Sequence, residues 1–162
     1  MGLFSRIFPK KELTIEPIDL SFLRNDIHSH LIPGIDDGSP DMETTIMLLK
    51  KFIDLGYKKV ITTPHVMSDY YKNTPEIILS GLDKVKTEII KNNLSIEIEA
   101  AAEYNLEPEF EDLLEKNNLL TFGPEKYLLF ELSFFDEPPR VNDVIWKMRE
   151  KGVSPVLAHV ER

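Results

Sequence analysis

The chain has 162 residues, of which 42% are hydrophobic and 29% are charged, so it can build the core of one folded domain and is not typical of a disordered chain. Its formal net charge of -9 disfavours nucleic acid and anionic membranes as partners. No apolar run is long enough to insert stably in a membrane. The absence of cysteine excludes disulfides, thiolate metal sites and a cysteine nucleophile, and favours a cytoplasmic protein.

Residues 1–24 are expected to be an N-terminal extension. Its first eleven residues are too short and too interrupted by charge for a signal peptide. From residue 25 to residue 162, short β-branched stretches alternate with stretches of helical periodicity. The predicted strands cover residues 26–28, 59–63, 95–102, 127–132 and 155–158. This alternation predicts one α/β domain with a parallel sheet covered by helices, in which all strand C-terminal ends lie on one side.

Helix start and stop signals separate these strands. Ser39 and Thr74 are expected to cap the first two helices, each with a proline at the first helical position. A third helix is expected after Pro108, and Gly56 and Gly152 are expected to end the first and the last helix. A polar loop after the second strand carries two adjacent tyrosines at positions 70 and 71, which we interpret as loop anchors rather than as recognition residues.

All four histidines lie at or just after the end of a predicted strand. His28 and His30 are two residues apart, and residues i and i+2 of a strand point to the same face, so two imidazoles there can bind one metal ion. His65 follows the second strand and His159 closes the fifth. A single His-x-His pair is weak evidence, since a surface pair without a role is common, but the joint placement favours a metal site.

Three carboxylates fall on the same side of the predicted sheet. Glu131 lies within an apolar strand, and a buried carboxylate needs a partner or a metal. Glu103 follows the third strand, and Asp37 lies in the loop after the first, beside Asp36. Each has a plainer alternative, because Asp37 suits an ordinary turn and Glu103 a solvated strand end. His159 could likewise be a core histidine with satisfied hydrogen bonds.

Imidazole and carboxylate ligands without thiolate suit zinc, manganese or iron. Two such ions about 3.5–4 Å apart can hold a hydroxide, lower the pKa of water to roughly 7 and clamp both ends of a displacement at phosphorus. No side-chain nucleophile is then required, in keeping with the absence of cysteine.

The ordered set of motifs resembles the polymerase-and-histidinol-phosphatase (PHP) superfamily. Within it, the set is similar to the bacterial metal-dependent tyrosine-protein phosphatases linked to capsule and exopolysaccharide synthesis. The motifs are Asp26-Ile27-His28-Ser29-His30, Asp36-Asp37-Gly38, Thr63-Pro64-His65, Ala102-Glu103, Phe130-Glu131 and Ala158-His159-Val160-Glu161-Arg162. The resemblance implies a distorted TIM-like (βα) barrel that hydrolyses phosphotyrosine in proteins by attack of a metal-bridging hydroxide on phosphorus, with a bacterial tyrosine kinase as substrate.

The resemblance also implies a site for two or three divalent ions, with manganese as the first choice and iron or zinc as alternatives. Carried over residue by residue, His28, His30 and Glu103 hold the first ion. Glu103, Glu131 and His159 hold the second, with Glu103 bridging. Asp37 and His65 hold the third, and Arg162 matches a catalytic arginine near the phosphate.

Two departures from the family pattern matter. Val160 replaces the usual residue of the last motif, and no counterpart exists of an Asp-x-His pair that the family supplies from later βα units. We therefore expect a barrel that is incomplete at its C-terminus and leaves apolar residues poorly shielded, namely Ile61, Leu129, Phe130, Val156 and Leu157. The chain is then expected either to form homo-oligomers through its open sheet edge or to be only marginally stable. The alternatives are a small-molecule phosphatase, such as a histidinol-phosphate phosphatase, and a non-catalytic metal-binding module.

Overall fold

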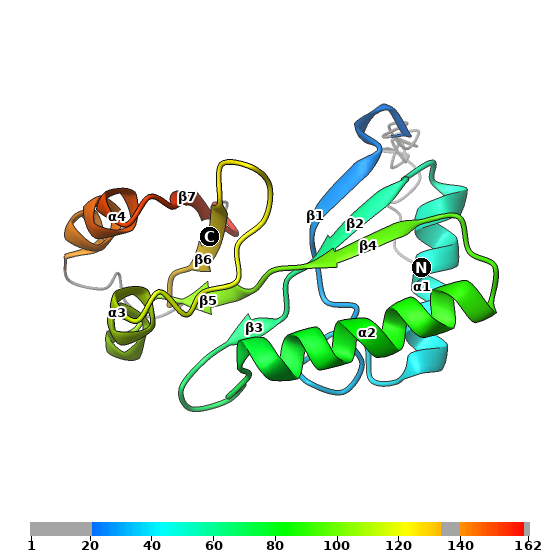
Figure 1. Cartoon of the computed structure of the whole chain (residues 1–162), viewed down its shortest axis with the longest axis horizontal. Helices are drawn as coiled ribbons and strands as arrows, with labels where there is room; N and C mark the ends of the chain where they lie inside the picture. The colour runs from blue at the N-terminus through cyan, green and yellow to red at the C-terminus, as the bar shows by residue number, and fades with distance from the viewer. Residues whose placement is uncertain (1–20, 134–139, 161–162) are drawn as a thin grey trace, which may run out of the picture.

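The computed structural model describes residues 21–133 and 140–160, and its helices and parallel strands confirm the α/β class. In chain order the elements are η2 (Ser21–Leu23), β1 (Asn25–Ser29), α1 (Met42–Asp54), β2 (Lys59–Thr62), β3 (His65–Val66), α2 (Pro75–Lys91), β4 (Glu97–Ala100), β5 (Glu103–Asn105), α3 (Pro108–Glu115), β6 (Tyr127–Glu131), α4 (Val141–Glu150) and β7 (Ser154–Leu157). Figure 1 shows α1 and α2 beside β1, β2 and β4, and α3 and α4 beside β5, β6 and β7.

The strands form two parallel sheets that continue into one another. The strand orders are β1-β2-β4 and β3-β5-β6-β7. The chain passes from β2 to β3 through Thr63 and Pro64, and from β4 to β5 through Ala101 and Ala102. Hydrogen bonds bridge both interruptions, since the Ala101 N–H donates to the Thr62 carbonyl at 2.9 Å and the Glu103 N–H to the Pro64 carbonyl at 3.0 Å. The described strands thus form one bent parallel surface that is five strand positions wide, and closure into a barrel stays a prediction.

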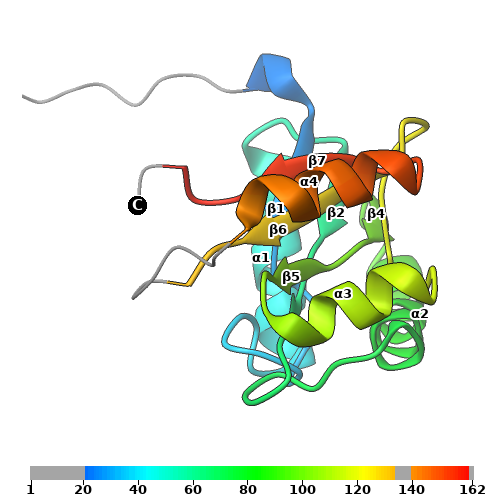
Figure 2. The same ribbon diagram turned by 90° about the vertical axis from the view of Figure 1, so that its left-hand side faces the viewer.

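The main hydrophobic core lies between this surface and the helices. In α2, the predicted stripe of Ile78, Leu82, Val85 and Ile89 is buried against the core, as its helical spacing requires. Figure 2 looks from the side of α3 and α4 and shows these two helices in front of β5, β6 and β7. Among the described residues, no helix combines the length and the apolar character needed to cross a bilayer.

A second, smaller cluster covers the opposite face of the strands. It consists of Ile61, Ala101, Phe122, Leu129 and Ala158. Phe122 reaches this face because the turn before β6 folds back on itself, with paired backbone hydrogen bonds of 3.0 and 2.8 Å between Phe122 and Tyr127.

The expectation of poorly shielded residues is therefore wrong for three positions. Ile61 is only 6% exposed, Leu129 2% and Phe130 2%, because Phe122 covers the first two and Phe130 faces the helix-side core. On β7, the outermost strand of the described sheet, Leu157 is 38% exposed. Association of two copies through this edge stays a prediction.

Of the two predicted helix N-caps, one is confirmed and the other is wrong. Thr74 caps α2 as predicted, with its side chain accepting a hydrogen bond from the Ile77 N–H. The N-cap of α1, however, is Asp41 and not Ser39. Ser39 is held in the preceding loop because its N–H donates to the His30 carbonyl at 3.0 Å and its hydroxyl donates to the Asp41 carbonyl at 2.9 Å. The backbone of Ser39 is thus hydrogen-bonded to His30 at the end of β1, and Asp41, the next polar residue, caps the helix.

The loop between β1 and α1 is packed tightly against α2. Ile32 is 1% exposed, and a Cβ atom built on Gly81 in α2 would lie 2.3 Å from its Cγ2 atom. The same loop carries Asp36 and Asp37, so the absence of a side chain at Gly81 allows the close packing of the segment that precedes these carboxylates.

We predict that Gly81→Ala lowers the free energy of unfolding by about 1–3 kcal/mol, because the added methyl group overpacks a buried contact. Elsewhere in a helix interior the same substitution stabilises by up to about 1 kcal/mol, so the expected sign is reversed here. Denaturant unfolding monitored by circular dichroism measures the effect. Ser80→Ala, at the exposed neighbouring position, is the control and should be neutral or slightly stabilising; a gain in stability from Gly81→Ala would contradict the packing argument.

Candidate metal centre

Strand ends bring the polar residues together. His28 lies in β1 and His30 directly follows it, while His65 and Glu103 open β3 and β5 and are register partners. Glu131 is the last residue of β6. These positions lie on one side of the sheet because the described strands are parallel. His65 and Glu103, however, begin short strands after the bend, where the sequence predicted them to follow strands that end.

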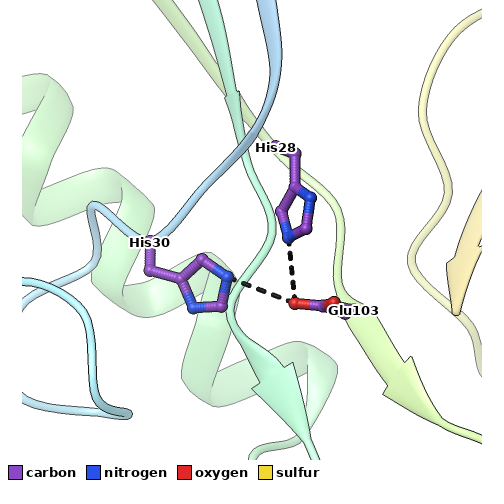
Figure 3. A group of neighbouring side chains, drawn as sticks. All are labelled: His28, His30 and Glu103. Atoms are coloured by element: carbon purple, nitrogen blue, oxygen red, sulfur yellow. Dashed lines mark hydrogen bonds and ion pairs between the residues drawn. The ribbon is translucent and has the colours of Figure 1, made fainter. Parts of the chain in front are cut away.

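Glu103 is the centre of the cluster. Its side chain is 0% exposed, and its Oε2 atom lies 3.0 Å from His28 Nε2, 3.3 Å from His30 Nε2 and 3.4 Å from His65 Nδ1. Its other oxygen, Oε1, lies 3.1 Å from His159 Nε2. Figure 3 shows His28 and His30 both pointing at the carboxylate. All four histidines of the chain therefore reach one buried glutamate.

His65 links this centre to the remaining carboxylates. Its Nδ1 atom lies 3.0 Å from Glu131 Oε1, and its Nε2 atom lies 3.5 Å from Asp37 Oδ1. Glu131 is buried, whereas the Asp37 side chain is 63% exposed at the mouth of the cluster. The structure thus brings together seven of the eight residues singled out in the sequence, and Arg162 lies outside the described residues.

Within the part of the chain that the structure describes, three groups of ligand atoms are compact enough to hold a cation, with all atoms in each group within 4.8 Å of one another. They are His28, His30 and Glu103; His30, Asp37 and His65; and His65, Glu103 and Glu131. The first is the set that the resemblance implies for the first ion. In the other two, His30 or His65 joins the expected carboxylates, so the histidines are shared between neighbouring positions.

Asp36 is a site residue that the sequence analysis did not predict, since it assigned a ligand role only to the neighbouring Asp37. The Asp36 carboxylate is 0% exposed and accepts hydrogen bonds from His30 Nδ1 at 2.7 Å, the Gly38 N–H at 3.0 Å and the His65 N–H at 3.1 Å. The adjacent pair of acids was the available signal. Only the path of the loop shows that the first acid turns inward behind the histidines while the second faces the mouth.

The contacts of Asp36 impose a condition on His30. Because Nδ1 of His30 donates to Asp36, a neutral imidazole would present the lone pair of Nε2 to Glu103 Oε2 only 3.3 Å away. Two acceptors in such contact require a positive charge between or beside them. A divalent cation or a proton on His30 meets this requirement, and imidazole with carboxylate is a donor set that fits manganese, iron or zinc.

The pKa shifts of the site follow from the same contacts. Burial alone would lower the pKa of His30, but its hydrogen bonds to Asp36 and Glu103 raise it to about 9. Burial likewise opposes ionisation of Glu103, yet the hydrogen bonds from His28 and His30 hold its pKa well below its usual range. Against the cost of burial, the hydrogen bond to Glu131 and the charge of Glu103 raise the pKa of His65. Protons can therefore neutralise the carboxylates until a cation replaces them.

His159 reaches the cluster through an uncommon backbone conformation. Its φ angle is +52°, in the left-handed region that costs non-glycine residues about 1 kcal/mol or more. This conformation turns the chain after β7 so that the imidazole meets Glu103. Backbone strain of this kind is concentrated at functional sites.

We predict that the stability of the metal-free chain falls as the pH rises from about 6.5 to about 9. Between the ordinary pKa of 6.5 and the folded value of about 9, folded His30 keeps a proton that the unfolded chain has released. The stabilisation is fully present below the first value and lost above the second. Over the same window the affinity for Mn²⁺ should rise by up to about tenfold per pH unit, because the cation displaces this proton.

Thermal melts in the presence of a chelator and Mn²⁺ titrations at several pH values measure both slopes. His30→Gln, which cannot carry the proton, should flatten the pH dependence of the melting temperature. A wild-type melting temperature that is constant from pH 6.5 to 9 would show that His30 is not protonated in the folded chain.

Comparison with known proteins supports the resemblance seen in the motifs. The family model for capsular polysaccharide synthesis proteins CpsB/CapC matches residues 24–162. The chain is 31% identical over 137 residues to the tyrosine-protein phosphatase YwqE of Bacillus subtilis, covering 85% of this chain and 54% of that protein. It is 29% identical over 140 residues to the tyrosine-protein phosphatase CpsB of Streptococcus pneumoniae, covering 85% and 56%.

The fold agrees with these sequence matches. A solved structure from work on YwqE of Bacillus subtilis and CpsB of Streptococcus pneumoniae, described as unique metal-dependent tyrosine phosphatases, superposes with a TM-score of 0.78 at 31% identity. The match covers 85% of this chain and 56% of that one. The chain spans about half the length of the curated relatives it matches. Since the family model covers nearly the whole described chain, this protein belongs to the CpsB/CapC family of capsular polysaccharide synthesis proteins.

Proposed function

We propose that this chain provides the divalent-metal centre of a protein-tyrosine phosphatase, with a phosphotyrosine-bearing bacterial tyrosine kinase as the substrate. The observation that carries the proposal is the fully buried Glu103 carboxylate, approached by all four histidines of the chain. The names of the relatives, which are tyrosine-protein phosphatases, support the choice of reaction and substrate.

The ligand assignment follows the carboxylate contacts. His28, His30 and Glu103 would hold one ion, Glu103, Glu131 and His159 a second, and Asp37 and His65 a third, with manganese as the first choice. The two oxygens of Glu103 support a bridging role because Oε2 faces His28 and His30 whereas Oε1 faces His159. Ions bound there supply a water of lowered pKa and positive charge toward the phosphoryl oxygens.

The surrounding residues orient these ligands and govern access. Asp36 fixes the His30 ring by accepting from Nδ1, which leaves Nε2 directed at Glu103. The exposed Asp37 carboxylate marks the side from which substrate enters. A phosphate dianion would be repelled by this acidic mouth unless cations are present, so the residues favour a reaction that requires metal. Arg162, outside the described residues, is proposed to meet the phosphoryl oxygens through its planar guanidinium.

We predict that the chain releases phosphate from a phosphotyrosine peptide with Mn²⁺, that chelation abolishes the release, and that thiol alkylation does not affect it because the chain has no cysteine. The double variant His28→Gln/His30→Gln should lose at least one bound metal ion per chain by elemental analysis and lower turnover by two orders of magnitude or more. Glu115→Gln, on the exposed face of α3, is the matched control and should leave both unchanged.

The outcomes distinguish the alternative functions. Hydrolysis of histidinol phosphate but not of the peptide would identify a small-molecule phosphatase. Full metal binding with no turnover on either substrate would identify a non-catalytic metal-binding module. Metal content that survives the double histidine substitution would overturn the ligand assignment itself.

A further inference from the structure

The His65 ring connects the inner carboxylates of the cluster to the carboxylate at its mouth. Its two nitrogens face different carboxylates, with Nδ1 at 3.0 Å from Glu131 and 3.4 Å from Glu103, and Nε2 at 3.5 Å from Asp37. A rotation of the imidazole about its Cβ–Cγ bond would turn both nitrogens away from their partners. The plane of this ring therefore decides whether the inner carboxylates and the one at the mouth can share a ligand.

Tyr71 is stacked on that plane. The Tyr71 and His65 rings are nearly parallel, with an interplanar angle of 12° and centroids 5.5 Å apart. His30 meets the His65 ring edge-on, with an interplanar angle of 63° and centroids 4.6 Å apart. An aromatic neighbour lying parallel to an imidazole limits its rotation, because any turn of the ring forces the two faces into contact.

The loop that carries Tyr71 is tied to the strand that carries His65. The Tyr71 carbonyl accepts hydrogen bonds from the Met67 N–H at 2.9 Å and from the Asn73 N–H at 2.7 Å. The Asn73 side-chain amide donates to the His65 carbonyl at 2.8 Å and to the Ile35 carbonyl at 3.1 Å. Tyr71 is thus held at a fixed position relative to His65 and to the loop that bears Asp37.

A second anchor joins the same loop to α3. The N–H and the hydroxyl of Ser68 both donate to the Glu107 carboxylate, at 2.7 and 3.0 Å. The neighbouring Tyr70, by contrast, is 83% exposed. The loop therefore orients one tyrosine of the pair toward the cluster and leaves the other in solvent, which makes Tyr70 a matched control one residue away.

We propose that Tyr71 is a positioning residue, whose ring stacks on His65 and holds its imidazole in the orientation required to bind a divalent cation together with Asp37. This role rests on the proposed metal centre and extends it to a residue that does not itself bind the ion. The interaction depends on the aromatic face and not on the phenol hydroxyl. Loss of the ring should weaken cation binding by about two- to tenfold, the range expected for one aromatic pair.

The test titrates the full 162-residue chain with Mn²⁺ by calorimetry, comparing Tyr71→Leu, Tyr71→Phe and Tyr70→Leu with the wild type. Tyr71→Leu should weaken the binding of one ion by about two- to tenfold. Tyr71→Phe, which keeps the stacked ring, should restore wild-type affinity, and Tyr70→Leu should have no effect. The metal-free melting temperature of each variant shows whether the fold is intact.

Histidine side-chain NMR of the metal-free chain gives a second readout that does not depend on metal. The ring protons of His65 should lose the part of their ring-current shift that comes from Tyr71 in Tyr71→Leu and keep it in Tyr71→Phe. Unchanged Mn²⁺ affinity in Tyr71→Leu would overturn the positioning role while leaving the metal centre in place. A loss that Tyr71→Phe shares, together with a lower melting temperature, would make Tyr71 a purely structural residue. A wild-type chain that binds no Mn²⁺ would overturn the metal centre and this role with it.

Discussion

The burial of the Glu103 carboxylate is the constraint on which the rest of the structure depends. An ionised carboxylate with no exposure to solvent is stable only when charged or hydrogen-bonding partners surround it. Here the partners are imidazoles from β1, the start of β3 and the segment after β7, elements that are far apart in the sequence. The sheet must bring these elements into one register, since a slip by a single residue in β5 would turn Glu103 to the opposite face. Fold and site are thus specified by the same contacts.

The bend in the sheet keeps the strands in register and places the ligand residues directly after it. The strands are interrupted at Thr63-Pro64 and at Ala101-Ala102, immediately before His65 and Glu103. Proline has no N–H to donate, and the two alanines are fully buried and small, so the neighbouring strands can pack closely as the sheet turns. The hydrogen bond from the Glu103 N–H to the Pro64 carbonyl keeps the strands paired across the bend. His65 and Glu103 begin the short strands beyond the bend, and there they meet the imidazoles of His28 and His30 from the end of β1.

What could be predicted from the sequence followed local periodicity. The two-residue spacing of His28 and His30 and the carboxylate of Glu131 within an apolar strand were sufficient to place them at one end of a parallel sheet. Non-periodic segments were harder to predict. Nothing local distinguishes Asp36 from Asp37, because the loop path depends on contacts with other segments, among them Ile32 with Gly81 in α2 and Gly38 with His30. The burial of Ile61 and Leu129 under Phe122 was not predicted either, because Phe122 lies in a turn whose path also depends on contacts with other segments.

Two further differences have equally specific causes. Ser39 and Asp41 are both good capping residues, and a backbone hydrogen bond to His30 decides between them. The adjacent tyrosines at positions 70 and 71 have the same chemistry, yet only the second stacks on His65, because the turn closed by Met67 and Asn73 fixes its direction. In each case a contact distant in sequence selects between residues that are locally equivalent, so periodicity and propensity could not identify the choice.

The acidity of the cluster also determines the order in which its partners can bind. Asp36, Glu103 and Glu131 lie behind the histidines, and Asp37 lies at the mouth, so the metal-free site attracts cations and repels a phosphate dianion. Protons on His30 and His65 can neutralise part of this charge while keeping the side chains in place. The ligands are then already oriented when a cation arrives, and little reorganisation opposes its binding. Under the proposed function, a phosphoryl group can approach only after cations reverse the local charge, so metal binding is a precondition of substrate binding.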